Sequence, residues 1–87
     1  MEKSIKIPFK FGVHVRPAVK LAELAQKFRS YIYIEKDGQK ANAKSPIEII
    51  TLAIMPNSTI KIVAQGEDEK SAIETITKFF NDYVDNI

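Results

Sequence analysis

The residues of this chain with the most recognisable chemistry lie in one short segment, residues 12–18. The segment contains the only histidine of the chain, His14, and Arg16 follows two residues later. An imidazole has an ordinary pKa of about 6.5, so near neutral pH much of it is a free base with a nucleophilic ring nitrogen. Arg16 stays charged at physiological pH and can donate two parallel hydrogen bonds to phosphoryl oxygens. The pair suits phosphoryl transfer, which depends mainly on positioning and positive potential.

The residues around His14 predict that it lies at the start of a helix. Pro17 fits a first helical turn, where its missing N–H would have no intrahelical acceptor. The residue before a proline avoids helical geometry, so we place the boundary at or just before Arg16. Gly12 can adopt a positive φ, which lets the chain turn sharply before the helix. Free N–H groups and the positive end of the helix dipole bind anions, so we predict an anion-binding mouth at His14.

A lone histidine at a helix start also has a simpler interpretation. Such a residue is more often an ordinary surface group or a helix cap than a catalytic group. A metal site is not favoured, because the chain has one His and no Cys. We therefore expect no metal and no other cofactor, and the absence of Cys excludes disulfides and thiol chemistry.

The composition is typical of a small globular protein. Its 87 residues provide for one hydrophobic core, and we predict a single domain over residues 1–87. A net charge of +2, with the two signs interspersed, does not indicate a nucleic-acid partner. No signal peptide is recognisable, and no stretch approaches ~18 consecutive apolar residues, so we expect a cytoplasmic protein without membrane insertion.

Hydrophobic periodicity predicts four strands that would support the His14 segment. Pro8 cannot donate to a ladder, so the first strand is expected at a sheet edge. Asp37-Gly38 is a strong signal for a two-residue hairpin between the second and third strands. The predicted strands cover residues 4–9, 31–34, 40–43 and 60–64.

Helical spacing predicts three helices between these strands. The first covers residues 17–29. Ser45 as N-cap, Pro46 at the first position and Glu48 at the third form a capping box, which starts a short helix that reaches about residue 53. Acidic residues 67–69 suit the positive end of a last helix. Its apolar face consists of Ile73, Ile76, Phe80 and Val84.

The resulting order, β-α-β-β-α-β-α, indicates an α+β fold of two layers with one sheet face covered by helices. Periodicity alone leaves open a ferredoxin-like strand order and the other order available to such a chain.

Segment 12–18 resembles the phosphorylation motif of the HPr family of phosphocarrier proteins, Gly-aliphatic-His-x-Arg-Pro-Ala. The defining positions are met by Gly12, Val13, His14, Arg16, Pro17 and Ala18. The resemblance continues through Asp37-Gly38, residues 43–45 and the fourth strand, and covers nearly the whole chain. It implies an HPr-like open-faced sandwich, in which a four-stranded antiparallel sheet of order 1-4-2-3 is covered by three helices.

The resemblance also implies a role in the phosphoenolpyruvate-dependent sugar phosphotransferase system. In the family the histidine accepts a phosphoryl group from enzyme I and passes it to an EIIA protein or domain. His14 matches that histidine, Arg16 matches the arginine that steadies the phosphoryl group, and Gly12, Pro17 and Ala18 support the helix start. Such a protein is a carried substrate of two enzymes rather than an independent catalyst, and we expect a monomer.

Ser45 matches the regulatory serine that HPr kinase phosphorylates in HPr proteins of Gram-positive type. Pro46 and Glu48 depart from the sequence that usually follows it, and the capping box explains the serine without regulation. Regulation through a kinase and a transcription regulator therefore stays one of two alternatives.

Partner docking in the family uses an apolar surface around the first two helices, with a basic rim for acidic partner faces. Any of the matching aliphatic residues could instead belong to the core, and for Ile50 the two alternatives are evenly balanced. Phe11 departs from the family, where small polar residues are common, and either packs over the His14 loop or joins the docking surface. The candidate docking residues are Val19, Lys20, Lys44, Ile47 and Ile50.

Three other functions compete with the sugar-transport carrier. A carrier of the nitrogen-related branch shares the histidine motif but serves different partners. An HPr-like regulatory module would dock on a transcription factor or metabolic enzyme without relaying phosphate. A small ferredoxin-like RNA binder fits the element order alone, but Tyr31 and Tyr33 do not lie in a Gly-rich basic motif.

Overall fold

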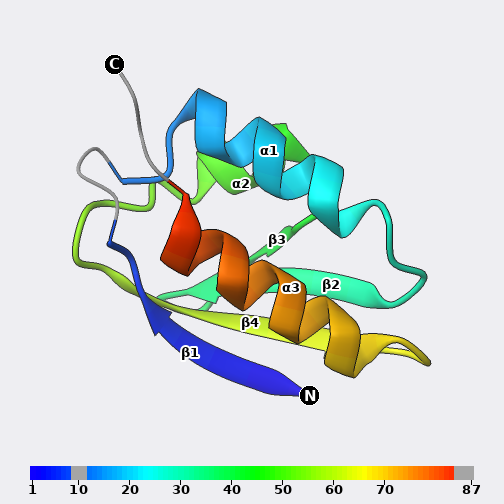
Figure 1. Ribbon diagram of the computed structural model, residues 1–87. Coiled ribbons are helices and arrows are strands. Elements are labelled where there is room, and N and C mark those ends of the chain that lie inside the picture. Colours follow the sequence, from blue (N-terminus) through cyan, green and yellow to red (C-terminus); the bar gives the residue numbers. More distant parts are fainter. Residues whose placement is uncertain (9–11, 84–87) are drawn as a thin grey trace.

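Four strands form one antiparallel sheet in the computed structural model, which describes residues 1–8 and 12–83 (Figure 1). The strand order is β1-β4-β2-β3, as the resemblance to the HPr family predicts. Ile34, for example, pairs with Ala41 of one neighbouring strand and Ile62 of the other. The strands are β1 (Glu2–Lys6), β2 (Tyr31–Lys36), β3 (Gln39–Asn42) and β4 (Thr59–Gln65).

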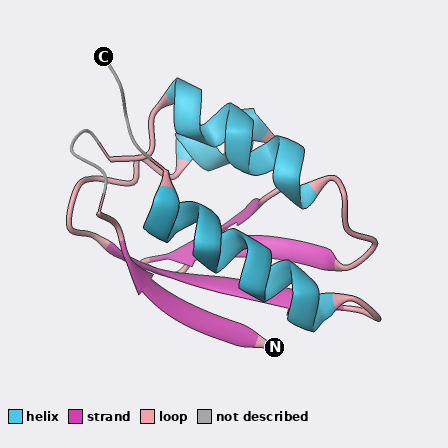
Figure 2. Ribbon diagram, viewed as in Figure 1, coloured by secondary structure: helices cyan, strands magenta, loops and turns pink. Residues whose placement is uncertain are grey.

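All three helices of the described chain lie on one face of this sheet (Figure 2). They are α1 (Val15–Ala25), α2 (Pro46–Thr51) and α3 (Glu69–Asp82). The predicted α+β class and two-layer arrangement are confirmed. None of these helices is long and apolar enough to cross a bilayer. The large, fully enclosed apolar side chains include Ile7, Leu21, Ile32, Ile34, Ile49, Ile60, Ile62, Ile76 and Phe80.

The opposite face of the sheet carries tyrosine and charged side chains. The rings of Tyr31 and Tyr33 lie 5.6 Å apart, and the Lys40 ammonium lies 4.8 Å from the centre of the Tyr33 ring. Lys61 lies 3.6 Å from the carboxylates of both Glu2 and Glu35, so one lysine links three strands. Exposed ion pairs of this kind contribute about 0–1 kcal/mol each, so the backbone ladder and the apolar core hold the sheet.

The first strand occupies a sheet edge, which confirms the expectation drawn from Pro8. Pro8 itself follows the strand, which ends at Lys6. Pairing with the segment before β4 continues for one residue: the Ile7 N–H donates to the Ser58 carbonyl, and the Ile7 carbonyl accepts from Asn57. The predicted end of this strand, Phe9, lies outside the described residues.

The bounds of the first helix differ from the prediction of residues 17–29. The helix begins at Val15 and ends at Ala25. Its last turn tightens, because the N–H groups of Lys27 and Phe28 bond to carbonyls three residues back rather than four. Apolar spacing continues to Phe28 because this side chain still packs against the core after the helix has ended. In the last helix, Val84 lies outside the described residues.

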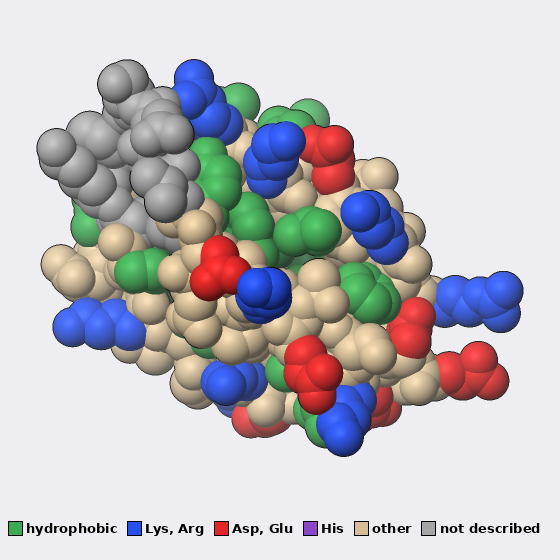
Figure 3. Space-filling view, in the orientation of Figure 1, with side chains coloured by type: hydrophobic (Ala, Val, Ile, Leu, Met, Phe, Trp, Pro, Cys, Tyr) green, Lys and Arg blue, Asp and Glu red, His purple; other side chains and the backbone are tan. Residues whose placement is uncertain are grey.

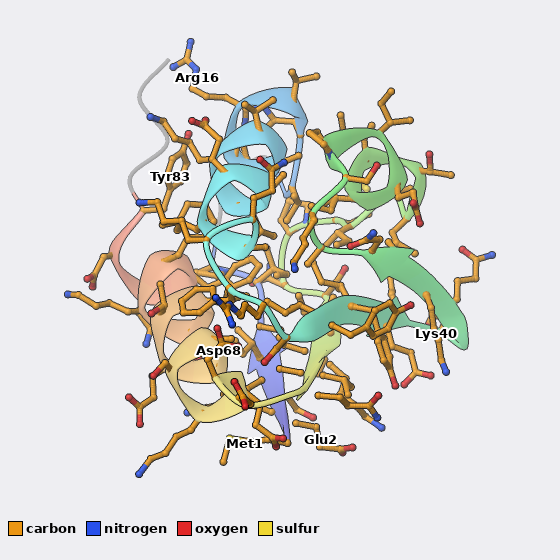
Figure 4. All side chains as sticks on the ribbon, turned by 90° about the vertical axis from the view of Figure 1, so that its right-hand side faces the viewer. Met1, Glu2, Arg16, Lys40, Asp68 and Tyr83 are labelled. Carbon is orange, nitrogen blue, oxygen red and sulfur yellow. The ribbon has the colours of Figure 1, made fainter. Side chains whose placement is uncertain are left out.

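A carboxylate at the start of α3 fixes the loop that connects α1 to β2 (Figure 4). The Asp68 carboxylate accepts hydrogen bonds from the backbone N–H groups of Arg29 and Ser30, each at 2.9 Å, and from the Ser30 hydroxyl. Asp68 is the N-cap residue of α3, but its side chain does not cap that helix. The acidic residues lie at the positive end of α3 as predicted, and the Asp68 carboxylate in addition forms a contact across the fold that the sequence did not indicate.

We expect this contact to make stability depend on acid pH. The hydrogen bond from Ser30, followed by that from the Arg29 N–H, lowers the pKa of Asp68 below its ordinary value. A lowered pKa in the folded state stabilises the protein above the unfolded pKa, and this stabilisation is lost as pH falls through the folded pKa. Replacing Asp68→Asn should therefore lower the free energy of unfolding at about pH 7 and reduce its change on going to about pH 3.

Urea unfolding at both pH values measures this effect, with Glu67→Gln, an exposed neighbour, as the control. An unchanged pH dependence in the Asp68 variant would show that the contact does not stabilise the fold.

Candidate functional site

His14 is the N-cap residue of α1, so the histidine stands where the backbone N–H groups of the helix begin. Its backbone is extended, with φ −98° and ψ −165°. The N–H of Ala18 is the first to bond back along the chain, at 3.0 Å from the His14 carbonyl oxygen. The N–H groups of Val15 and Arg16 precede this first bond, and the first turn contains no acidic residue. This end of the helix therefore presents its positive potential beside His14.

Pro17 occupies the third helical position, within the first turn as predicted, because the helix begins two residues before the predicted bound at residue 17. The first turn tolerates this position because no intrahelical acceptor exists there for the missing N–H. Arg16 adopts helical geometry despite preceding a proline, and the helix begins at Val15, just before Arg16, as expected. Pro17 and Ala18 are both buried and form part of the packed base of the site.

The segment before His14 is fixed by a main-chain contact with the residues that follow α2. The Val13 N–H donates to the Ile54 carbonyl oxygen at 2.9 Å. Gly12 has φ +70°, as its glycine identity predicts. A Cβ added at this position would lie 2.3 Å from the same Ile54 oxygen, far inside any permitted contact. Gly12 is therefore required both by its backbone angle and by a close approach that local sequence gives no reason to expect.

The two candidate chemical groups differ in exposure. His14 is half-buried, while Arg16 is exposed and extends away from the start of α1 (Figure 4). The described residues contain no cluster of His, Cys, Asp and Glu that could hold a metal ion. The arrangement combines a nucleophilic ring at the N-cap of α1 with a guanidinium two residues later, in the first turn.

Apolar side chains are exposed on α1, on α2 and in the segment after α2. Ile47 is 76% exposed and Ile50 is 37% exposed. Ile49, on the same short helix, points into the core and is fully enclosed. Ile50 therefore lies on the surface rather than in the core. Val15 and Met55, each 62% exposed, were not identified from the sequence. Val15 lies off the apolar stripe of its helix and Met55 sits in a turn, so each is an apolar residue where periodicity predicts a polar one.

The two predicted basic residues have different surroundings. Lys20 is exposed on α1. We expect Lys44 on the same rim, but its ammonium donates to the Phe28 carbonyl oxygen at 2.7 Å and its own carbonyl accepts from the Gln26 side chain. These bonds tie the end of α1 to the start of α2. The lysine ammonium suits this place, because carbonyls left unpaired at a helix end attract a cation.

Ser45 caps α2 as predicted, but the capping box is incomplete. The Ser45 hydroxyl accepts a hydrogen bond from the Glu48 N–H at 3.3 Å, and Pro46 is the first helical residue. The Ser45 N–H donates to the Asn42 carbonyl instead of the Glu48 carboxylate, which accepts from the Asn42 N–H at 3.1 Å. The expected reciprocal bond is absent because the Ser45 N–H already has an acceptor.

A second apolar surface lies between α1 and α3. Hydrophobic side chains appear there among basic ones in Figure 3. The groove has a volume of about 310 Å³. None of the candidate docking residues lines it. Its lining residues are Leu24, Thr75, Lys78, Phe79, Asp82 and Tyr83.

Comparisons with known proteins agree with the motif. A family model described as the PTS HPr component phosphorylation site matches residues 1–82. Phosphocarrier protein HPr of Buchnera aphidicola subsp. Baizongia pistaciae is 46% identical over 78 residues, which cover 90% of this chain and 92% of that protein. HPr-like protein Crh of Halalkalibacterium halodurans is 42% identical over 79 residues, which cover 91% of this chain and 94% of that protein.

Solved structures share the fold. HPr-C-His from Thermoanaerobacter tengcongensis matches with a TM-score of 0.90 and 38% identity, over 93% of this chain and 91% of that chain. A crystal structure of an HPr dimer from the same organism matches with a TM-score of 0.75 and 39% identity, over 88% of each chain.

The close approach of Gly12 to Ile54 predicts a large effect of a single methyl group. Gly12→Ala should lower the free energy of unfolding by at least about 2 kcal/mol, because a disfavoured backbone angle and a steric clash act together. Gly38→Ala is the matched control, since Gly38 has φ +81° but no atom within 4 Å of an added Cβ. This control should lose only about 1 kcal/mol.

Chemical denaturation of both variants measures the difference. Equal losses would show that the contact with Ile54 imposes no steric requirement.

Proposed function

The chain belongs to the HPr family of the phosphotransferase system, and we propose that it carries a phosphoryl group on His14 between two other proteins. The donor is enzyme I, which takes its phosphoryl group from phosphoenolpyruvate, and the acceptor is an EIIA protein or domain of a sugar transporter. The observation that supports this proposal most strongly is the position of His14 as N-cap of α1, with Arg16 in the first turn.

The proposed reaction needs only groups that the helix start contains. A ring nitrogen of neutral His14 attacks phosphorus, a nitrogen–phosphorus bond forms, and the bond from phosphorus to the donor breaks with return of its electron pair to enzyme I. Negative charge spreads over the phosphoryl oxygens during transfer. The helix dipole, the N–H groups of the first turn and the Arg16 guanidinium all favour that charge. The same groups hold the phosphoryl group until the acceptor nucleophile attacks it.

The apolar surface around His14 is the proposed docking surface for both partners. Val19, Ile47 and Ile50 are exposed on α1 and α2, as expected for docking residues. Val15 and Met55 extend this surface. Lys20 supplies positive charge for an acidic partner face, whereas Lys44 is used within the fold.

We also propose that residues 1–87 form a single domain that acts in the cytoplasm as a monomer. A carrier that meets two partners in turn must expose the same surface to each, and self-association through that surface would compete with both. A structural relative has been crystallised as a dimer. Size-exclusion chromatography with light scattering, at the concentration of the transfer assay, should therefore be used to measure the oligomeric state, and we expect the mass of a monomer.

Labelling by phosphoenolpyruvate and a compatible enzyme I tests the proposed carrier. Wild-type protein should acquire acid-labile, base-stable phosphate, and His14→Ala should acquire none. Arg16→Met should slow labelling about 10-fold or more, since a charge-assisted hydrogen bond contributes about 1.5–3 kcal/mol. Arg29→Met, which removes the other exposed arginine, is the matched control and should be labelled at the wild-type rate.

Wild-type protein that stays unlabelled with enzyme I of both the sugar and the nitrogen branch would refute the carrier proposal. It would favour the regulatory binding module. Labelling by only one enzyme I type would assign the branch.

A regulatory role for Ser45 is the second candidate. Resemblance to HPr-like protein Crh as well as to HPr makes such a role relevant. Ser45 precedes the exposed Ile47 on the same helix, so a phosphate there would alter the proposed docking surface. The first N–H groups of α2 favour a phosphate, but the nearby Glu48 carboxylate opposes it. The partners implied are HPr kinase/phosphorylase and a transcription regulator.

Incubation with HPr kinase and ATP should place label on Ser45, and Glu48→Gln should increase the extent of labelling because it removes the opposing charge. Ser45→Ala should abolish the label, while Ser71→Ala, at an exposed serine of α3, should not. Absence of label from the wild-type protein would reject the regulatory role.

A further inference from the structure

A lysine from the sheet closes the carboxyl end of α2. Lys36 is the last residue of β2, and its ammonium donates to the carbonyl oxygens of Leu52 at 3.2 Å and Ala53 at 3.0 Å. These carbonyls directly follow the last helical residue, Thr51, where backbone acceptors lose their intrahelical donors. One cation therefore holds two consecutive peptide groups at the exit of the helix.

The second of these peptide groups has an unfavourable conformation. Ala53 has φ +52°, in the left-handed region that favours glycine. Helices often end with a glycine in this conformation, but here the residue carries a Cβ. The Ala53 N–H bonds to the Ile50 carbonyl at 3.0 Å, and Lys36 holds the carbonyl on the other side. Both polar groups of the Ala53 backbone are thus held in place.

The residue after Ala53 is the one on which the His14 segment rests. The Ile54 carbonyl oxygen accepts from the Val13 N–H at 2.9 Å and lies against Gly12. Because Ile54 directly follows Ala53, the backbone angles of Ala53 determine where the chain places Ile54 and, with it, this oxygen. A continuous path of contacts therefore leads from Lys36 through Ala53 and Ile54 to the N-cap of α1.

We propose that Lys36 is a positioning residue for phosphoryl transfer, which it supports by holding Ala53 in the left-handed conformation that aims the Ile54 carbonyl at Val13. This inference rests on the proposed function of His14. Lys36 does not touch the phosphoryl group, and its effect passes through the backbone of residues 52–54.

The test combines removal of the Lys36 ammonium with relief of the strain at Ala53. Lys36→Met should lower the rate of phosphoryl transfer from enzyme I about 10-fold, at a temperature where circular dichroism shows the variant folded. Lys36→Met with Ala53→Gly should recover most of the rate, because glycine adopts the left-handed conformation without help. Lys36→Arg should keep the rate, since a guanidinium can donate to both carbonyls.

Lys40→Met is the matched control. Lys40 lies on the same hairpin, but its ammonium is placed over the Tyr33 ring on the open sheet face (Figure 4). Loss of this charge should leave transfer unchanged. Lys36→Met with a wild-type rate, or a double variant that stays slow, would overturn the proposal.

Amide hydrogen exchange of Val13 supplies a readout that needs no enzyme I. Exchange should be about 10-fold faster in Lys36→Met and return toward the wild-type rate with Ala53→Gly. If the wild-type protein accepts no phosphate, the proposed function fails. Unchanged Val13 exchange in Lys36→Met would overturn the positioning path whichever result the transfer assay gives.

Discussion

The geometry of the candidate site depends on one close contact between two backbone segments. Residues 12–13 lie directly against the carbonyl of Ile54, at a distance that only a glycine permits on one side of the contact. The hydrogen bond from Val13 fixes the direction in which α1 begins, and His14 is the next residue. This contact joins the start of α1, and with it His14, to the segment that leaves α2. The position of His14 at the start of α1 thus depends on the segment that follows α2.

Local sequence predicted the parts of this arrangement that local physics decides. Pro17 marked the first turn of α1, Gly12 marked a positive φ, and Ser45 marked the N-cap of α2. Periodicity located every strand and helix of the described chain, with errors at their ends. Strand order did not follow from periodicity, because either order buries the same faces. The resemblance of residues 12–18 to a phosphorylation motif supplied it, and the sheet confirmed it.

The features that the sequence did not reveal are contacts between distant segments. Asp68 is a helix-terminal acid as predicted, but the sequence did not indicate that its carboxylate also accepts from the loop before β2. Lys44 looked like a surface cation, yet it closes the end of α1. Lys36 had no assigned role, yet it holds the exit of α2. Each polar side chain found a backbone partner more than 15 positions away, as the sequence separations of 38, 16 and 16 show. Helix and strand propensities and hydrophobic spacing depend on residues that are close in the sequence, so they do not predict hydrogen bonds between distant segments.

The attachment of α1 at both ends has a mechanical consequence. Its beginning is bonded to the segment that leaves α2, and its end is bonded through Lys44 to the segment that enters α2. The two helices are therefore linked to each other at both ends. In the proposed function, a partner that docks on α1 and α2 would find these helices already joined to each other, with little internal freedom to lose on binding. The relative placement of the two helices would then be set when the chain folds rather than when a partner binds.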